Sequence, residues 1–157
     1  MSPRNPTTDA ADAPPSQAQA ALRFGWWGLL LFATAGLGLE ALHGFKVAGY
    51  LDVGQETRRL MWTLAHAHGT LLSLIHIAWG ASLAVLGRGD VRRRRWIGRL
   101  LRIATVLLPG GFALGGVWVH GGDPGIAAAL LVPPGALTLL VALGLAAREM
   151  SAAEETD

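Results

Sequence analysis

Three long stretches of the chain contain no charged residue, and a fourth contains only one. The uncharged stretches are residues 60–87, 103–122 and 124–147, whereas residues 24–45 contain Glu40 as their single charge. Each stretch is between 20 and 28 residues long, and a helix needs about 20 apolar residues to cross the hydrocarbon core of a bilayer. The pattern therefore predicts an all-α integral membrane protein with four transmembrane helices, and it argues against a water-soluble domain.

The composition agrees with this prediction and excludes several other classes of protein. Only 15% of the 157 residues are charged, whereas a soluble domain is charged at about a quarter of its positions. The chain contains no cysteine, which excludes a disulfide scaffold and any metal site or catalyst that depends on a thiol. No residue constellation of a hydrolase or transferase is present either, so the sequence leaves open whether the protein is an enzyme.

The basic residues indicate how the four helices are oriented. Ten of the thirteen fall on one side of the predicted membrane, namely Arg4, Arg23, Arg88, Arg92, Arg93, Arg94, Arg95, Arg99, Arg102 and Arg148; Lys46, Arg58 and Arg59 fall on the other. The positive-inside rule then predicts an up-down bundle in a bacterial-type cytoplasmic membrane, with both termini cytoplasmic. Topology and anionic lipid headgroups explain the arginine run, so a nucleic-acid partner is not expected.

The charge gaps also divide the chain into a membrane domain and two tails. Residues 1–22 are rich in Ala, Pro, Ser, Thr and Asp and are expected to form a disordered cytoplasmic tail. Residues 149–157 are expected to form a short, frayed cytoplasmic tail. The transmembrane domain covers residues 23–148, and its spans are expected at about 24–45, 60–87, 97–119 and 126–147. Five of the six tryptophans fall near predicted interfaces, which supports this assignment independently.

Glycine and proline residues mark the two C-terminal spans. Gly111 and Gly115 form a small-xxx-small pair, a pattern that lets two membrane helices approach closely. Pro109 in the third span and Pro133-Pro134 in the fourth lack backbone donors and should kink or loosen these helices. The pattern favours helix packing, and a deformable half of the bundle that opens a cavity or gate is the alternative.

Ionisable residues at membrane depth are the candidates for function, because burying them is costly. Four of the five histidines are predicted near the outer membrane face. Imidazoles and carboxylates suit transition metals, and a pair of imidazoles suits haem b. We therefore expect a metal ion or haem b to bind there and to serve redox chemistry or a respiratory complex. The candidate cofactor ligands are His43, His66, His68 and His120, and Glu40 and Asp123 are candidate metal ligands or partners of these histidines.

Helix geometry separates two of these histidines. At 100° per residue, His66 and His68 project about 200° apart on one helix and cannot both face one centre. His66, Thr70, Ser73 and His76 form a polar stripe that is expected to face the bundle interior.

The His-Ala-His segment at residues 66–68 is similar to the His-x-His-bearing helix of haem–copper oxidase catalytic subunits. The resemblance covers only these few residues. Those enzymes have twelve spans and further histidines that this chain lacks, so the resemblance does not imply oxidase activity.

Two other functions are compatible with the same residues. In a structural or assembly subunit without a cofactor, the histidines would only form hydrogen bonds across helices. In a small transporter or proton channel, Glu40, His66 and His76 would form a relay. The expected partners are the lipid bilayer and other membrane subunits or a second copy of the chain.

Overall fold

The computed structural model describes residues 16–51, 53–86 and 90–154, and nearly all of them are helical. The elements in chain order are α2 (Gln17–Gly44), α3 (Ala48–Leu51), the 3-10 helix η1 (Val53–Gln55), α4 (Glu56–Leu86), α5 (Val91–Val117) and α6 (Ile126–Glu154). The four long helices are each long and apolar enough to cross a membrane. This confirms the prediction of an all-α protein with four candidate spans.

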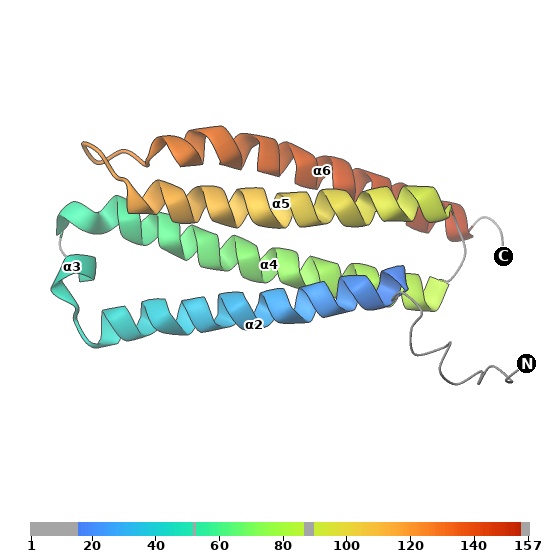
Figure 1. Cartoon of the computed structure of the whole chain (residues 1–157), viewed down its shortest axis with the longest axis horizontal. Coiled ribbons are helices and arrows are strands. Elements are labelled where there is room, and N and C mark those ends of the chain that lie inside the picture. Colours follow the sequence, from blue (N-terminus) through green and yellow to red (C-terminus); the bar gives the residue numbers. More distant parts are fainter. Residues whose placement is uncertain (1–15, 52, 87–89, 155–157) are drawn as a thin grey trace, which may run out of the picture.

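The long helices lie side by side along the long axis of the molecule (Figure 1). α2 packs along α4, α4 along α5 and α5 along α6, whereas α2 and α5 meet over a short stretch only. The short helix α3 and the turn between α5 and α6 lie at one end, and the start of α2 and the end of α6 lie at the other. The helices thus form a row in which the first and last members are each packed mainly along one side.

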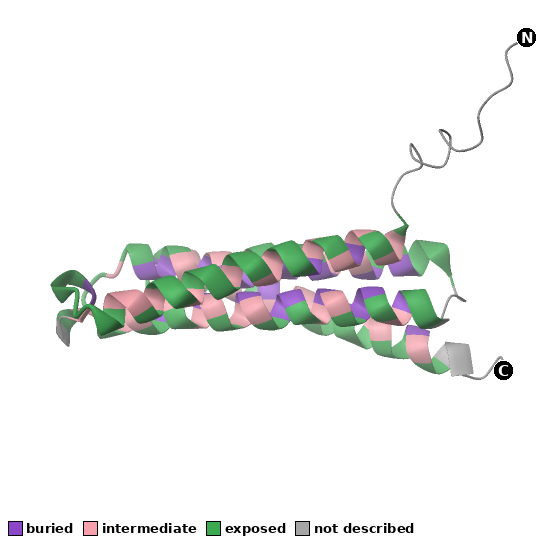
Figure 2. Cartoon of the chain, turned by 90° about the horizontal axis from the view of Figure 1, so that it is seen from below, coloured by how far each residue is buried: buried purple, intermediate pink, exposed green. Residues whose placement is uncertain are grey.

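Large apolar side chains cover the outer surfaces of this row. Figure 2 shows exposed positions over the outer faces of the helices and buried positions in bands along the seams between them. Trp26, Leu37 and Leu130 are 60%, 70% and 65% exposed, respectively. Apolar surface on this scale is unfavourable in water. It is the expected outer surface of a helix that contacts lipid.

Glycine residues bring the helices together within two seams. A methyl group at Gly25 of α2 would lie 2.8 Å from the carbonyl oxygen of Ser73 in α4, so the two backbones are nearly in contact. Between α5 and α6, a methyl group at Gly115 would lie 2.7 Å from the Cβ atom of Ala128, and one at Gly111 would lie 2.9 Å from the Cβ atom of Leu131. The packing role predicted for Gly111 and Gly115 is therefore confirmed.

The prolines lie inside continuous helices. Pro109 is within α5, and Pro133 and Pro134 are within α6, yet both helices run unbroken through these positions. Membrane helices tolerate proline because neighbouring groups can compensate for the missing donors. A gating role for these prolines stays a prediction.

Both ends of the helical region extend beyond the expected span limits. α2 begins at Gln17 because Ser16 and Gln19 form a capping box, in which each side chain accepts a hydrogen bond from the other residue's backbone N–H. Residues 17–22, expected in the N-terminal tail, are therefore helical. Residues 1–15 of that tail lie outside the described residues. At the other end, α6 continues to Glu154.

Candidate functional site

The four histidines that were expected to gather at one face lie in different surroundings in the structure. Glu40 and His43 are exposed near the end of α2, and His120 and Asp123 are exposed in the turn between α5 and α6, where their backbones exchange two hydrogen bonds. His66 and His68 are half-buried on α4. Among the residues that the structure describes, no three His, Asp or Glu side chains gather closely enough to hold a metal ion.

His66 faces α2. Its Nδ1 atom lies 2.7 Å from the carbonyl oxygen of Phe32, and its ring lies against the backbone of Gly36, where a methyl group would lie 2.3 Å from the ring carbon Cε1. Because a carbonyl oxygen can only accept a hydrogen bond, Nδ1 must donate, and Nε2 is the nitrogen with the lone pair in the neutral ring. A larger residue at position 36 would exclude the imidazole from this place.

His68 and His76 also have Nδ1 hydrogen-bonded to a carbonyl oxygen of their own helix, at Leu64 and Leu72 respectively. The centre of the His68 ring lies 4.9 Å from the centre of the Phe112 ring in α5. His68 therefore faces α5 whereas His66 faces α2, which confirms that the two side chains project in different directions. The centre of the His76 ring lies 4.5 Å from the centre of the Phe24 ring in α2.

The polar stripe of α4 therefore packs against α2 rather than facing the centre of a closed bundle. Ser73, which is fully buried, lies against Gly28 of α2 and donates its hydroxyl hydrogen to the carbonyl oxygen of Gly69. The buried hydroxyl of Thr70 has no hydrogen-bond partner among the described residues. The helices form a row, and the direct contacts of His66, Ser73 and His76 outside their own helix are therefore with α2, while His66 and His76 also line cavities that α5 borders.

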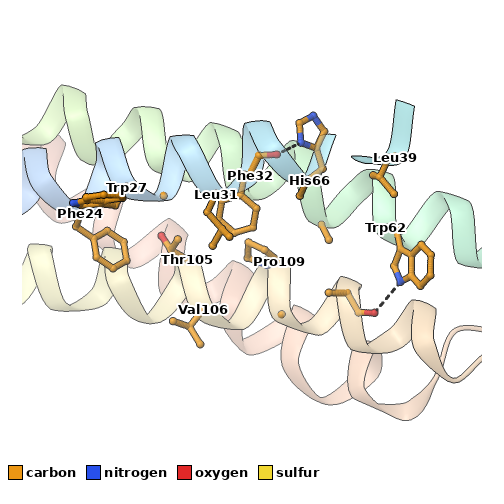
Figure 3. A pocket seen from close by; sticks show the side chains of 15 residues that line it. Phe24, Trp27, Leu31, Phe32, Leu39, Trp62, His66, Thr105, Val106 and Pro109 are labelled. Atoms are coloured by element: carbon orange, nitrogen blue, oxygen red, sulfur yellow. Dashed lines mark hydrogen bonds between the residues drawn. The ribbon is translucent and has the colours of Figure 1, made fainter. Parts of the chain in front are cut away.

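An apolar cavity of about 620 Å³ lies where α2 and α5 diverge, with α4 behind it. Figure 3 shows Phe24, Leu31 and Phe32 on the α2 side and Thr105, Val106 and Pro109 on the α5 side. Its volume is in the range of cofactor and ligand pockets. The lining includes Phe24, Trp27, Phe32, Trp62, His66 and Pro109.

Trp62 connects one end of this cavity to α5. Its Nε1–H donates to the carbonyl oxygen of Ala113 at 3.2 Å, as Figure 3 shows. Arg58, one turn earlier on α4, donates from Nε to the carbonyl oxygen of Gly116 at 3.0 Å and lies over the Trp62 ring. Carbonyls in the last turn of a helix lack partners within it, so Arg58 helps to cap α5. From the sequence, Arg58 was used only to orient the helices in the membrane. Its i, i+4 spacing from Trp62 was the signal that both side chains lie on one face of the helix.

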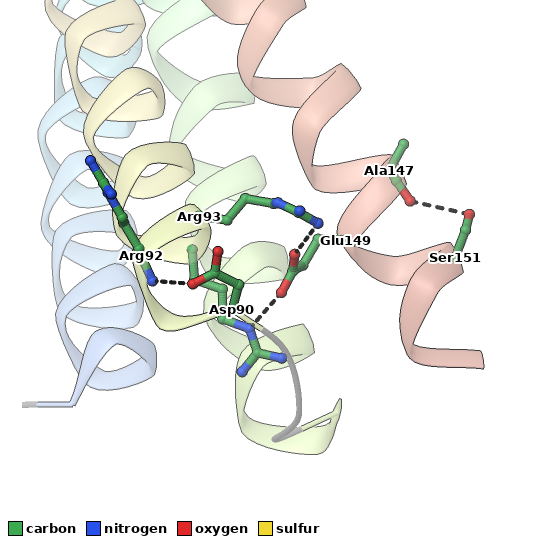
Figure 4. Close-up of polar contacts among 7 residues, drawn as sticks. Asp90, Arg92, Arg93, Ala147, Glu149 and Ser151 are labelled. Carbon is green, nitrogen blue, oxygen red and sulfur yellow. Dashed lines mark hydrogen bonds and ion pairs between the residues drawn. The ribbon is translucent and has the colours of Figure 1, made fainter. Parts of the chain in front are cut away.

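A buried ion pair joins α5 to α6 at the other end of the molecule (Figure 4). Glu149 is 3% exposed and accepts hydrogen bonds from Nε of Arg94 at 3.0 Å and from Nη1 of Arg93 at 3.2 Å. The expectation that Glu149 begins a frayed tail was therefore wrong. The signal available in the sequence was a carboxylate directly after the last predicted span, on the side where the arginine run was predicted.

These features define an all-helical protein with four candidate membrane spans, an apolar cavity bordered by three of them and a buried ion pair near one end. Compared with known proteins, the chain matches no protein-family model, no curated protein and no solved structure.

Proposed function

We propose that the chain is an integral membrane protein that binds haem b beside α2, α4 and α5, where His66 would hold the iron. In this proposal the bundle is up-down and both termini lie in the cytoplasm of a bacterial-type membrane. The excess of arginines at the start of α5 supports that orientation. The observation that carries the cofactor proposal is the apolar cavity, whose lining includes His66 although Figure 3 shows its imidazole directed toward α2.

The hydrogen bond of His66 supports a ligand role. In metal-binding histidines one ring nitrogen commonly donates to a carbonyl oxygen, which fixes the ring and leaves the other nitrogen for the metal. The Nδ1 contact with Phe32 is of this kind. The aromatic rings of Phe24, Trp27 and Phe32 supply the apolar walls that a porphyrin needs.

Haem is favoured over a bare transition metal ion by the number of ligands that each requires. A structural zinc site takes four protein ligands and a catalytic one three, whereas haem iron in many proteins is held by a single histidine. No group of three candidate ligands occurs within the described residues. The exposed residues Glu40, His43, His120 and Asp123 would reach a metal only at an interface with another chain, and His68 only from the α5 side.

The test is cofactor content. The full chain is expressed with haem supplied, purified in detergent, and examined by optical spectroscopy and metal analysis. We expect a Soret band in the wild type, its loss in His66→Ala and its retention in the matched control His68→Ala, with helix content unchanged by circular dichroism. A wild type without haem, or His66→Ala with wild-type haem content, would refute the proposal.

A structural or assembly subunit is the second candidate, and one observation favours it. The outer faces of α2 and α6 carry exposed apolar side chains that include Leu37 and Leu130, so another membrane subunit or a second copy could pack there. A relay through Glu40, His66 and His76 has no such support. Glu40 is exposed, and each of the two histidines has a hydrogen bond to a backbone carbonyl.

A further inference from the structure

A second cavity lies toward the end of the molecule where α2 begins, and its lining is polar. Its volume is about 240 Å³, and it is bordered by the start of α2, the later half of α4 and the first half of α5. Four arginines contribute to the lining: Arg94, Arg95, Arg99 and Arg102. The cavity is thus distinct from the apolar one in both position and chemistry.

Two buried acceptor atoms belong to residues that line this cavity. His76 is 1% exposed, and its Nε2 atom has no hydrogen-bond partner among the described residues. Because its Nδ1–H donates to Leu72, Nε2 carries the lone pair of the neutral ring. Gln17 is similar: its side-chain NH2 donates to the carbonyl oxygen of Val91, and its buried Oε1 has no partner in the described part of the chain.

The arginines give the cavity an excess of positive charge. Arg94 is paired with Glu149, and Arg99 lies with its guanidinium 5.5 Å from the centre of the Trp96 ring. Arg95 and Arg102 are exposed at the rim. Guanidinium groups bind phosphate and carboxylate anions strongly. An ammonium group, in contrast, would be repelled.

The ligand must therefore combine an anion with uncharged donors. The anion would satisfy the guanidinium groups, and hydroxyl groups would donate to Nε2 of His76 and Oε1 of Gln17, since a buried acceptor without a partner is costly. A cavity of about 240 Å³ has room for the liquid volume of roughly eight water molecules, which suits a small polar headgroup rather than a large cofactor.

We propose that this cavity binds a glycerophosphate group, that is, a phosphate anion with neighbouring hydroxyl groups. This chemistry occurs in the headgroup of phosphatidylglycerol and in free glycerol phosphate. Basic pockets between membrane helices on the cytoplasmic side are known binding places for anionic headgroups. The proposal is independent of haem binding, because it uses other residues at another level of the molecule.

The test measures lipid affinity of the full chain in neutral detergent by native mass spectrometry. The probes are phosphatidylglycerol and phosphatidylethanol, two anionic phosphodiesters of which only the first has headgroup hydroxyls. We expect the wild type to prefer phosphatidylglycerol. Arg102→Gln should weaken its binding about tenfold, whereas Arg92→Gln, at an exposed position outside the lining, should leave binding unchanged.

The role of the acceptors is tested separately. His76→Phe keeps a ring of similar size, and Gln17→Leu serves as a second variant in case the first does not fold. Each should reduce the preference for phosphatidylglycerol over phosphatidylethanol. Competition by millimolar glycerol phosphate would identify a soluble ligand, and its absence would identify the lipid. Equal binding of both lipids by the wild type, or equal effects of Arg102→Gln and Arg92→Gln, would overturn the proposal.

Discussion

The ion pair of Glu149 provides the sharpest prediction for stability. Glu149 and Arg94 are 3% and 8% exposed, so Glu149→Leu would leave a buried guanidinium without its counter-ion. Removing one partner of a buried pair costs about 3–5 kcal/mol, and we expect the free energy of unfolding to fall by about this amount. The side chain of Arg93 is 46% exposed, so Arg93→Met should cost no more than about 1 kcal/mol.

The measurement is equilibrium unfolding in mixed micelles with an increasing proportion of denaturing detergent, followed by tryptophan fluorescence and circular dichroism. The matched control is Arg148→Met, which removes a charge from the exposed residue next to Glu149. In the double variant Arg94→Met/Glu149→Leu both buried charges are absent. We expect it to recover most of the lost stability, because an apolar pair of similar size can replace a buried ion pair.

Two results would refute this reasoning. One is a loss below about 1 kcal/mol in Glu149→Leu, which would place the carboxylate among exposed ion pairs of small effect. The other is a double variant as unstable as Glu149→Leu alone, since the unpaired charge of Arg94 could not then be the cause of the loss.

Two further substitutions test the contacts between helices. Gly25→Ala would place a methyl group against the backbone of α4, so it should destabilise the protein by about 1–3 kcal/mol; Gly38→Ala, at an open helical position, should be neutral or stabilising by up to about 1 kcal/mol. Trp62→Phe removes the hydrogen bond to Ala113 and should cost about 1 kcal/mol, whereas Trp118→Phe at an exposed position should have little effect. Unfolding curves in detergent measure all four, and equal effects within either pair would contradict the assignment.

The four long apolar helices could be predicted because a single physical requirement, the exclusion of charge from hydrocarbon, leaves long uncharged stretches in the sequence. The start of α2 could not be predicted from these stretches. There the capping box of Ser16 and Gln19 initiates the helix among polar residues. A hydropathy pattern cannot reveal this start, because it depends on hydrogen bonds rather than on apolar side chains. The end of α6 was missed for a related reason: Glu149 is compatible with a buried position through its pairing with Arg94, and pairing depends on which helices are neighbours.

The candidate site was predictable in part. The angle between His66 and His68 follows from helix geometry and is confirmed by their contacts with α2 and α5, respectively. The expected gathering of histidines assumed a closed bundle, in which the ends of all the helices converge. In the row that the structure shows, α2 and α5 diverge and leave the apolar cavity between them. Periodicity within one helix carries no information about such an opening.

The glycine seam between α2 and α4 has a consequence for biosynthesis. All the residues that form it, from Ala18 to Gly80, precede the arginine run in the chain. Since chains are made from the N-terminus and early segments can fold first, we expect the first helical hairpin to assemble in the bilayer while α5 is still being synthesised. In the assembled hairpin, Arg58 and Trp62 would already be in place to donate hydrogen bonds to the end of α5 once that helix is synthesised.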